Sequence, residues 1–344
     1  MLPVGREQGA STRYRVLAYR PALEAAGYDV AVRFPLRLHG PLRVAWRIAD
    51  LMRDVTATAK ERVLFVHRKT YPPTLAPRLK RAGRKIVFDM DDAIDLPPPS
   101  TTLSSTAERR YRRNFVATVG AADLALCGNS ELARRLPHRR FELLPTPIDT
   151  VRFAPAAESA AQAEPTLGWV GYSDNLRYLE SLGEPLREIT RRHSGLRVIV
   201  VADRPPRLPG VAVEFRRWTL ESEVSCFQGM ALGLMPLEDT PWARGKCAFK
   251  AIQYMALGIP AVASPVGMNR ELIRHGATGF LPDSDREWVE SIDRLLSDGE
   301  LRSRIARAAR RVVEAEYSLD VMARRMVGIL DALDANPQHA ARSA

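Results

Sequence analysis

Two lysines at helical spacing, Lys246 and Lys250, follow a short apolar run in the segment ALGLMPLEDTPWARGKCAFKAIQYMALGIPAVAS. This pattern predicts a buried strand, a loop, a helix over about 246–257 and a second buried strand. At about 100° per residue, Lys246, Lys250 and Gln253 fall within about 60° of one another on that helix. A helix N-terminus beside two ammonium groups suits a diphosphate. The alternative is a solvated basic face, which two lysines at i, i+4 also form.

Acidic residues follow another predicted strand, in FDMDDAID. Asp89 and Asp91 form a D-x-D pattern immediately after the apolar stretch Lys85–Phe88, and Asp92 follows directly. Hard oxygen ligands in this pattern suit Mg²⁺ or Mn²⁺. The same acids could instead cap the next turn or pair with arginines. No clustered His/Asp/Glu ligand set accompanies them, so we expect no metal.

His67 ends the apolar run VLFVH and is followed by Arg68 and Lys69. At the carboxyl end of a parallel strand, its imidazole would reach a ligand hydroxyl. A single histidine in such a run is more often structural, and that alternative stays open.

The elements that would position these residues alternate between strand and helix, which predicts parallel α/β sheets. In the first half we expect strands at Tyr28–Phe34, Val63–His67, Lys85–Asp89, Leu124–Cys127 and Phe141–Leu144, with helices at about 41–59, 73–83, 104–120 and 129–136. In the second half we expect strands at Thr166–Val170, Leu196–Ala202, Val211–Phe215, Ala231–Pro236, Pro260–Ser264 and Gly279–Leu281. The helices there are expected at about 175–192, 219–229, 246–257, 284–297, 299–315 and 318–334.

The chain of 344 residues is therefore predicted to form two doubly wound domains that face one another across a cleft. Residues 1–147 would form the first, with a first strand built from Leu2–Val4 and a start that could be shortened. A connector spans 148–165, the second domain spans 166–320, and a C-terminal helix with a frayed tail spans 321–344.

Composition narrows the function classes. Net charge is +11, and this positive charge favours phosphate-bearing partners. Of the 51 basic residues, 45 are arginine. Three distant cysteines argue against a disulfide framework and for a reducing cytosol. Neither a secretory signal nor an apolar run of membrane-spanning length is present in this sequence.

The run P-L-x-D-T-P-W-x-x-G-K-C-A-F-K-x-x-Q-Y-M-A-L-G-I-P-x-V-A-S-P-V-G resembles the donor-binding domain of family 4 glycosyltransferases. Shorter matches follow the same order: FDMDDAIDLP, CGNSELA, LPTPIDTVRF, LGWVGYSDNLRYLESL and ATGFLPDSDREW. The resemblance implies the GT-B fold, with two Rossmann-like domains, and sugar transfer with retention. It implies that the turn containing Gly9 faces the donor phosphates.

The chain departs from the family pattern at two glutamates. The usual E-x7-E falls on Gly245 and Gln253, so both carboxylates are missing. The Arg and Lys that often follow the first strand of the donor domain are also absent after Gly171, where Tyr172 comes next. Lys246 and Lys250 could supply that positive charge.

The sequence therefore predicts a cytoplasmic glycosyltransferase that takes a nucleotide-sugar donor. Lys246 and Lys250 would hold the diphosphate, Gly171 would allow close backbone approach, and Gln253 would bind the ribose. His67 and Asp91 would face the sugar or a carbohydrate, lipid-linked or small-molecule acceptor. No cofactor or metal is expected.

Two other functions remain open. One is an impaired or regulatory nucleotide-sugar-binding protein of the same fold. The other is a basic nucleic-acid-binding protein, although no recognisable nucleic-acid module is present. The basic stretch from Glu108 to Arg113 opens an amphipathic helix that could contact an anionic membrane from the inner face, or could simply be solvated.

Overall fold

A computed structural model describes residues 1–36, 43–57, 60–80, 84–99, 101–136, 140–155 and 166–334. For residues 43–47, 57 and 334 it describes the backbone alone. The chain divides into two compact units. Unit 1 comprises Met1–Pro147 together with the residues from Leu319 onward, and unit 2 comprises Ile148–Ser318.

Unit 1 is built on a parallel five-stranded sheet in the order β1-β2-β3-β4-β5. The strands are β1 (Leu2–Pro3), β2 (Val63–His67), β3 (Lys85–Met90), β4 (Leu124–Cys127) and β5 (Phe141–Leu143). The interior strands are buried on both faces and therefore form continuous apolar runs.

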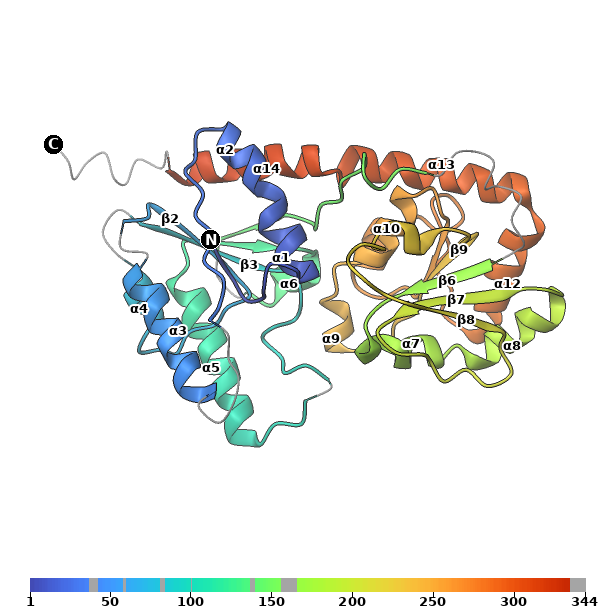
Figure 1. Cartoon of the computed structure of the whole chain (residues 1–344), viewed down its shortest axis with the longest axis horizontal. Coiled ribbons are helices and arrows are strands. Elements are labelled where there is room, and N and C mark those ends of the chain that lie inside the picture. The colour runs from blue at the N-terminus through green and yellow to red at the C-terminus, as the bar shows by residue number, and fades with distance from the viewer. Residues whose placement is uncertain are drawn as a thin grey trace. The chain divides into compact units, whose positions relative to one another are not determined.

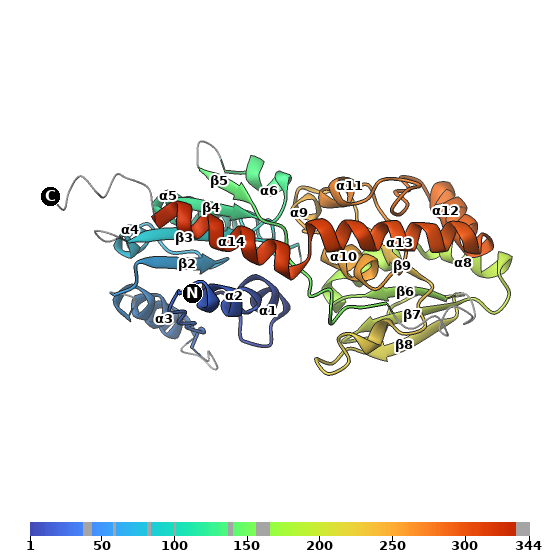
Figure 2. The ribbon, with the colours of Figure 1, turned by 90° about the horizontal axis from the view of Figure 1, so that it is seen from above.

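Helices cover both faces of this sheet. They are α1 (Ala10–Arg15), α2 (Arg20–Ala25), α3 (Arg43–Ala57), α4 (Ala76–Leu79), α5 (Ser105–Ala121), α6 (Ser130–Arg134) and α14 (Leu319–Asp334). On one face, α14 runs beside α2 (Figures 1 and 2), and its Met322 and Met326 join Phe65 and Val87 in one core. On the other face, Phe115 of α5 meets Phe88 edge-on, with ring centroids 6.0 Å apart.

The segment 28–36 is extended but is not the predicted strand. Its main chain meets the first residue twice: the Met1 amino group donates to the Ala31 carbonyl over 2.6 Å, and Arg33 N–H donates to the Met1 carbonyl over 3.0 Å. These two bonds are too few for a ladder. They still place this segment beside β1, on the side away from β2. The strand order thus reverses between β1 and β2, which is where open α/β sheets bind ligands.

Unit 2 holds a second parallel five-stranded sheet, in the order β10-β9-β6-β7-β8. Its strands are β6 (Thr166–Val170), β7 (Arg197–Ala202), β8 (Val213–Arg217), β9 (Leu232–Met235) and β10 (Ala261–Ala263), and Figure 2 shows β6, β7 and β8 side by side. The order reverses between β6 and β9. Two parallel, helix-flanked sheets confirm the predicted fold class.

The helices of unit 2 are α7 (Leu176–Glu180), α8 (Gly183–Arg192), α9 (Pro241–Arg244), α10 (Phe249–Ala256), α11 (Met268–Leu272), α12 (Asp285–Ser297) and α13 (Gly299–Glu316). Apolar residues of α7, α8, α12 and α13 form one core on the sheet. Helix α10 packs on β9 so closely that a Cβ on Gly233 would lie 2.3 Å from the Tyr254 ring. The Tyr254 hydroxyl accepts a 3.1 Å bond from Val170 N–H, which fixes α10 against β6.

Four predicted elements of unit 2 differ in the structure. The helix expected over 175–192 is split after Glu180, because Pro185 cannot donate within a helix interior. The helix expected over 219–229 is reduced to a 3₁₀ turn at Ser225–Phe227. Before this turn, the side chains of Thr219 and Ser222 form a hydrogen bond with one another that competes with helix formation. Residues 279–281 contribute only isolated bridges, from Gly279 to His275 and from Phe280 to Val262. The helix expected from Lys246 begins at Phe249.

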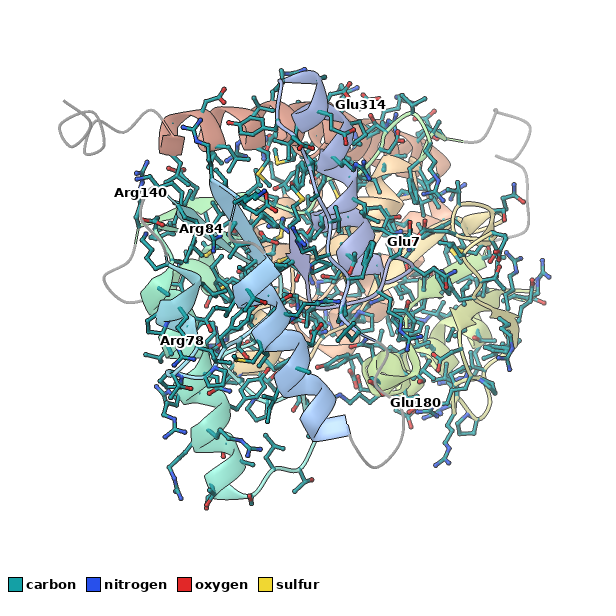
Figure 3. The ribbon with its side chains drawn as sticks, turned by 60° about the vertical axis from the view of Figure 1, so that its left-hand side comes forward. Glu7, Arg78, Arg84, Arg140, Glu180 and Glu314 are labelled. Carbon is teal, nitrogen blue, oxygen red and sulfur yellow. The ribbon has the colours of Figure 1, made fainter. Side chains whose placement is uncertain are left out.

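Two arginines, Arg84 and the partly buried Arg310, join segments of the chain through backbone carbonyls. Arg84 donates to the carbonyls of Glu61 and Leu79, which brings together the starts of β2 and β3 (Figure 3). Arg310 of α13 pairs with Glu314, also labelled in Figure 3, and donates to the carbonyls of Phe153, Ala256 and Thr150. Within the ranges given above, no helix is long and apolar enough to cross a bilayer.

Candidate functional site

His67 and Asp89 meet at the carboxyl edge of the unit 1 sheet. They are register partners on β2 and β3, and both side chains are fully buried. His67 Nδ1 lies 2.7 Å from Asp89 Oδ2. Because Asp89 also accepts from a guanidinium, it is an ionised acceptor, and the hydrogen of this contact therefore resides on Nδ1. Asp89 thus fixes the orientation of the imidazole.

Arg15 of α1 holds Asp89 from the other side. Its Nε donates to Asp89 Oδ2 over 3.2 Å, its Nη2 donates to Oδ1, and its Nη1 donates to the Leu144 carbonyl over 2.5 Å. Arg15 and Asp89 are both fully buried. Burial disfavours the Arg15 charge, but the Asp89 carboxylate outweighs that cost and raises the pKa of Arg15. This pair is a fixed support for His67.

Ser11 joins His67 to Asp91. Its hydroxyl donates to Asp91 Oδ2 over 2.9 Å, and the same oxygen lies 2.6 Å from His67 Nε2. Arg68 Nη1 lies 3.4 Å both from Ser11 Oγ and from Asp91 Oδ1. Three polar groups therefore converge on the hydroxyl oxygen of Ser11.

The backbone and the charges at this edge are both unusual. Arg68 has φ 55°, a left-handed conformation that non-glycine residues rarely adopt. Burial acts to raise the pKa of Asp91, but the electrostatic effects of Arg68, His67 and Arg15 outweigh it. The pKa of Asp91 is therefore lowered to about 2. Asp91 is therefore a carboxylate at every physiological pH.

In the described part of the chain, no three His, Cys, Asp or Glu side chains are grouped to hold a metal ion.

The predicted phosphate-facing glycine lies near these residues in sequence. Gly9 precedes α1, and its N–H donates to the Arg6 carbonyl over 3.0 Å. A Cβ at Gly9 would lie 3.2 Å from that same carbonyl oxygen. The glycine therefore allows a tight turn two residues before Ser11.

In unit 2, Lys250 and Gly171 lie together where the strand order reverses. Gly171 directly follows β6, and a Cβ there would lie 2.8 Å from Lys250 Cε and 2.5 Å from the Trp169 ring. Lys250 Nζ lies 5.6 Å from the Trp169 ring centroid, a cation–π distance. The ammonium group is thus held beside a backbone that has no side chain, at the position where open α/β sheets bind phosphates.

Lys246 and Gln253 are placed differently from Lys250. Lys246 lies in the loop before α10, because Ala248 adopts φ 49° and the helix starts after it. The predicted shared helix face of the two lysines is therefore wrong, although both stay in one strand-loop-helix junction. Gln253 is on α10 and 7% exposed.

Comparison with known proteins places this junction in a family. Residues 244–312 match the family model described as Glycosyl transferases group 1. The chain is 27% identical over 228 residues to D-inositol 3-phosphate glycosyltransferase of Nocardia farcinica, covering 57% of this chain and 49% of that protein. It is 27% identical over 247 residues to alpha-D-kanosaminyltransferase of Streptomyces kanamyceticus, covering 66% and 63%. The chain is therefore similar to the group 1 glycosyltransferases. It thus spans about half to two thirds of the length of these curated relatives.

Solved structures agree with this family's GT-B fold. Sucrose-phosphate synthase of Thermosynechococcus elongatus superposes with a TM-score of 0.72 over 95% of this chain and 94% of that one, at 17% identity. Anabaena HepE, solved in complex with UDP and glucose, gives a TM-score of 0.69 over 96% and 98%, at 16% identity. At these identities the likeness concerns the fold.

Sequence reasoning missed part of the unit 1 network. Arg15 carried no signal, because it is one of 45 arginines. Ser11 lay within the recognised glycine turn but was not singled out. Asp89 could have been paired with His67 from sheet register, because both end neighbouring strands.

Proposed function

We propose that this group 1 glycosyltransferase moves a sugar from a nucleotide-sugar donor to an acceptor, with retention of anomeric configuration. The bond between the anomeric carbon and the diphosphate oxygen breaks, and its electron pair leaves on the diphosphate. A bond to an acceptor oxygen forms, and the acceptor proton is released. The acceptor would be a carbohydrate, a lipid-linked or a small-molecule hydroxyl compound.

The observation that carries this proposal is Lys250 packed against Gly171 where the strand order of unit 2 reverses. Fixed positive charge stabilises the departing diphosphate as its charge develops. Lys250 and Lys246 take this role, Gly171 lets the phosphates approach the backbone, and Gln253 offers its buried amide to the ribose. The UDP bound by HepE supports a nucleotide-sugar donor for the present chain.

For unit 1 we assign His67 and Asp91 to hydroxyl groups of the sugar or acceptor. The convergence of His67, Asp91 and Arg68 on the Ser11 oxygen supports this assignment. Gly9 leaves the preceding turn open to the donor phosphates. Each assignment follows from the positions of these residues within their own unit.

A second candidate is a nucleotide-sugar-binding protein without turnover. Gly245 and Gln253 stand where the family usually has two glutamates, which favours this candidate. Ligand binding alone does not separate the two functions, whereas turnover does.

The test is a ligand panel followed by an activity assay. Thermal shift with UDP, GDP, ADP and a short oligonucleotide identifies the ligand class. Stabilisation by one nucleoside diphosphate supports both candidates, and stabilisation by the oligonucleotide alone contradicts both. Release of the matching nucleoside diphosphate from its sugar donor then separates the enzyme from the binder, and NMR of the product reports the anomeric configuration.

We further propose that no divalent metal takes part. Activity should be the same in EDTA as in added Mn²⁺. Turnover abolished by EDTA and restored by Mn²⁺ contradicts this proposal.

We also propose a cytoplasmic location with a peripheral contact to anionic membrane. Cys127, Cys226 and Cys247 are free and buried, in keeping with a reducing compartment. On α5, Phe115 and Val119 pack into unit 1, whereas Val116 is exposed. Any membrane contact through α5 should therefore be electrostatic. Flotation with anionic liposomes at low salt tests this, and equal recovery on neutral liposomes contradicts it.

A further inference from the structure

Tyr172 and Trp218 form an aromatic pair at the carboxyl edge of the unit 2 sheet. Tyr172 follows β6 by two residues, and Trp218 directly follows β8. Their ring centroids lie 6.0 Å apart at an interplanar angle of 55°. Tyr172 is 51% exposed, and Trp218 is half-buried. The pair therefore presents aromatic surface to the solvent.

The loop that carries Tyr172 is held in place by the strand between the two aromatic residues. Asp203 follows β7, and its two carboxylate oxygens accept from Ser173 N–H and from Ser173 Oγ–H, each over 2.7 Å. Trp218 N–H donates to the Ala202 carbonyl over 2.9 Å. Both aromatic residues are thus anchored to the end of β7. An anchored aromatic residue loses little conformational freedom when a ligand stacks on it.

The aromatic pair lies next to the proposed phosphate site on the same edge of the sheet. Tyr172 is the next residue after Gly171, against which Lys250 packs. From β6 to β8 the edge spans two strand spacings, or roughly 10 Å. A nucleoside diphosphate carries anionic groups at one end and a flat base at the other. A cation beside Gly171 and aromatic surface further along the same edge match these two ends.

We propose that Tyr172 and Trp218 form the platform on which the base of the nucleoside diphosphate stacks. The inference rests on the proposed function and adds the residues that bind the base. Every base has a π face, so stacking tolerates different bases. The platform supplies affinity for the nucleoside part of the donor, while Lys250 supplies affinity for the diphosphate.

The experiment compares nucleoside diphosphates with inorganic diphosphate, which has no base. Titration calorimetry with Tyr172→Ala and Trp218→Ala should show about 5- to 150-fold weaker binding of the nucleoside diphosphates that the parent binds. Binding of inorganic diphosphate should stay unchanged. Lys250→Ala is the reciprocal variant and should weaken both ligands. Phe141→Ala removes an exposed aromatic side chain of unit 1 and should change neither.

Trp218→Phe tests stacking without deleting the ring. It should keep most of the affinity, and it should reduce the quenching of tryptophan fluorescence that the nucleotide causes in the parent, with any remaining quenching coming from Trp169 beside Lys250. Because Phe retains most of the packing, this variant separates stacking from a failure to fold. Thermal unfolding of every variant reports its folded state.

Three results overturn the platform. The first is parent-like binding of nucleoside diphosphates by both alanine variants. The second is an equal loss of inorganic diphosphate binding, which means that the pair supports the loop and does not bind the base. The third is nucleotide quenching that is as large in Trp218→Phe as in the parent. A parent that binds no nucleoside diphosphate overturns the proposed function itself, a result distinct from the other three.

Discussion

His67 and Asp89 occupy the same register position on neighbouring parallel strands, and their side chains meet over 2.7 Å with neither exposed to solvent. Arg15 closes the arrangement from α1. The buried Asp89 carboxylate therefore has two partners: Arg15, which holds it in place, and His67, whose ring it orients. Its removal should affect both folding and catalysis, and these effects are separable.

Asp89→Asn should destabilise the protein by about 3–5 kcal/mol, because Arg15 would remain buried without its counter-charge. Urea unfolding measures this change. Glu24→Gln is the matched control, because it breaks the solvent-exposed Arg20–Glu24 pair and should cost less than about 1 kcal/mol. Equal losses for the two variants would show that burial of the Arg15–Asp89 pair contributes nothing.

His67→Asn should reduce turnover while retaining most of the stability. The Asn amide can still donate to Asp89, but it lacks the atom that reaches Ser11. A lost hydrogen bond to a charged or polarised group corresponds to about 10- to 150-fold in kcat/KM. Steady-state kinetics with the identified donor measures it, with thermal unfolding as the control for folding. Unchanged kinetics would assign His67 a structural role.

Asp91 should stabilise the protein above about pH 4 and lose that contribution as the pH falls toward 2. Its pKa is lowered from 3.8 to about 2, so the folded state keeps the carboxylate charged where the unfolded state is already protonated. The full contribution is about 2 kcal/mol. The unfolding free energies of the parent and of Asp91→Asn, measured across this range, should therefore converge with acid. A constant difference between them contradicts the lowered pKa.

Lys250→Ala should weaken nucleoside diphosphate binding by about 10- to 150-fold, because a charge-assisted hydrogen bond is lost. Lys246→Ala tests whether the loop lysine shares this role, now that the two lysines are known not to share a helix face. Lys60→Ala removes an exposed lysine from unit 1 and controls for net charge. Calorimetry measures all three. If both Lys246→Ala and Lys250→Ala bind like the parent, the diphosphate lies elsewhere.

Ala248→Gly should stabilise the protein by up to about 1 kcal/mol. Ala248 adopts φ 49°, where a Cβ is strained and glycine is not. Ala308→Gly, in the middle of α13, is the opposite case and should destabilise by about 1 kcal/mol. Chemical unfolding of the two variants should therefore give changes of opposite sign, and a loss at both positions would contradict the strain at Ala248.

Elements of the fold could be predicted where buried strands leave continuous apolar runs in the sequence. Strands β2, β3, β4 and β6 are buried on both faces, so each is a compact apolar run that matches its predicted bounds within one residue. The helices between Ala10 and Ala25 were missed, because two short helices separated by a 3₁₀ turn leave no sustained period. The break before α8 carried a signal at Pro185 that the prediction overlooked.

The site was less predictable because it depends on tertiary contacts. The carboxyl end of a strand placed His67 and Asp91 correctly at a sheet edge, since that follows from parallel pairing alone. The delay of α10 to Phe249 depends on the left-handed backbone at Ala248, which an alanine does not signal. The role of Tyr172 depends on Trp218, which lies 46 residues away in sequence and is brought near by the strand order.

The placement of α14 in unit 1 affects how the protein is made. Helix α14 contributes Met322, Ala323, Met326, Leu330 and Leu333 to a core whose other buried members all precede residue 145. On the ribosome, unit 2 is synthesised in full before this helix exists, whereas the core of unit 1 stays open until the last turns of α14 emerge. The usual N-to-C order of domain folding during synthesis is therefore reversed. A nascent chain arrested after Ser318 should contain a folded unit 2 and a unit 1 whose apolar core is still exposed. Chaperones should therefore bind unit 1, although it is synthesised first.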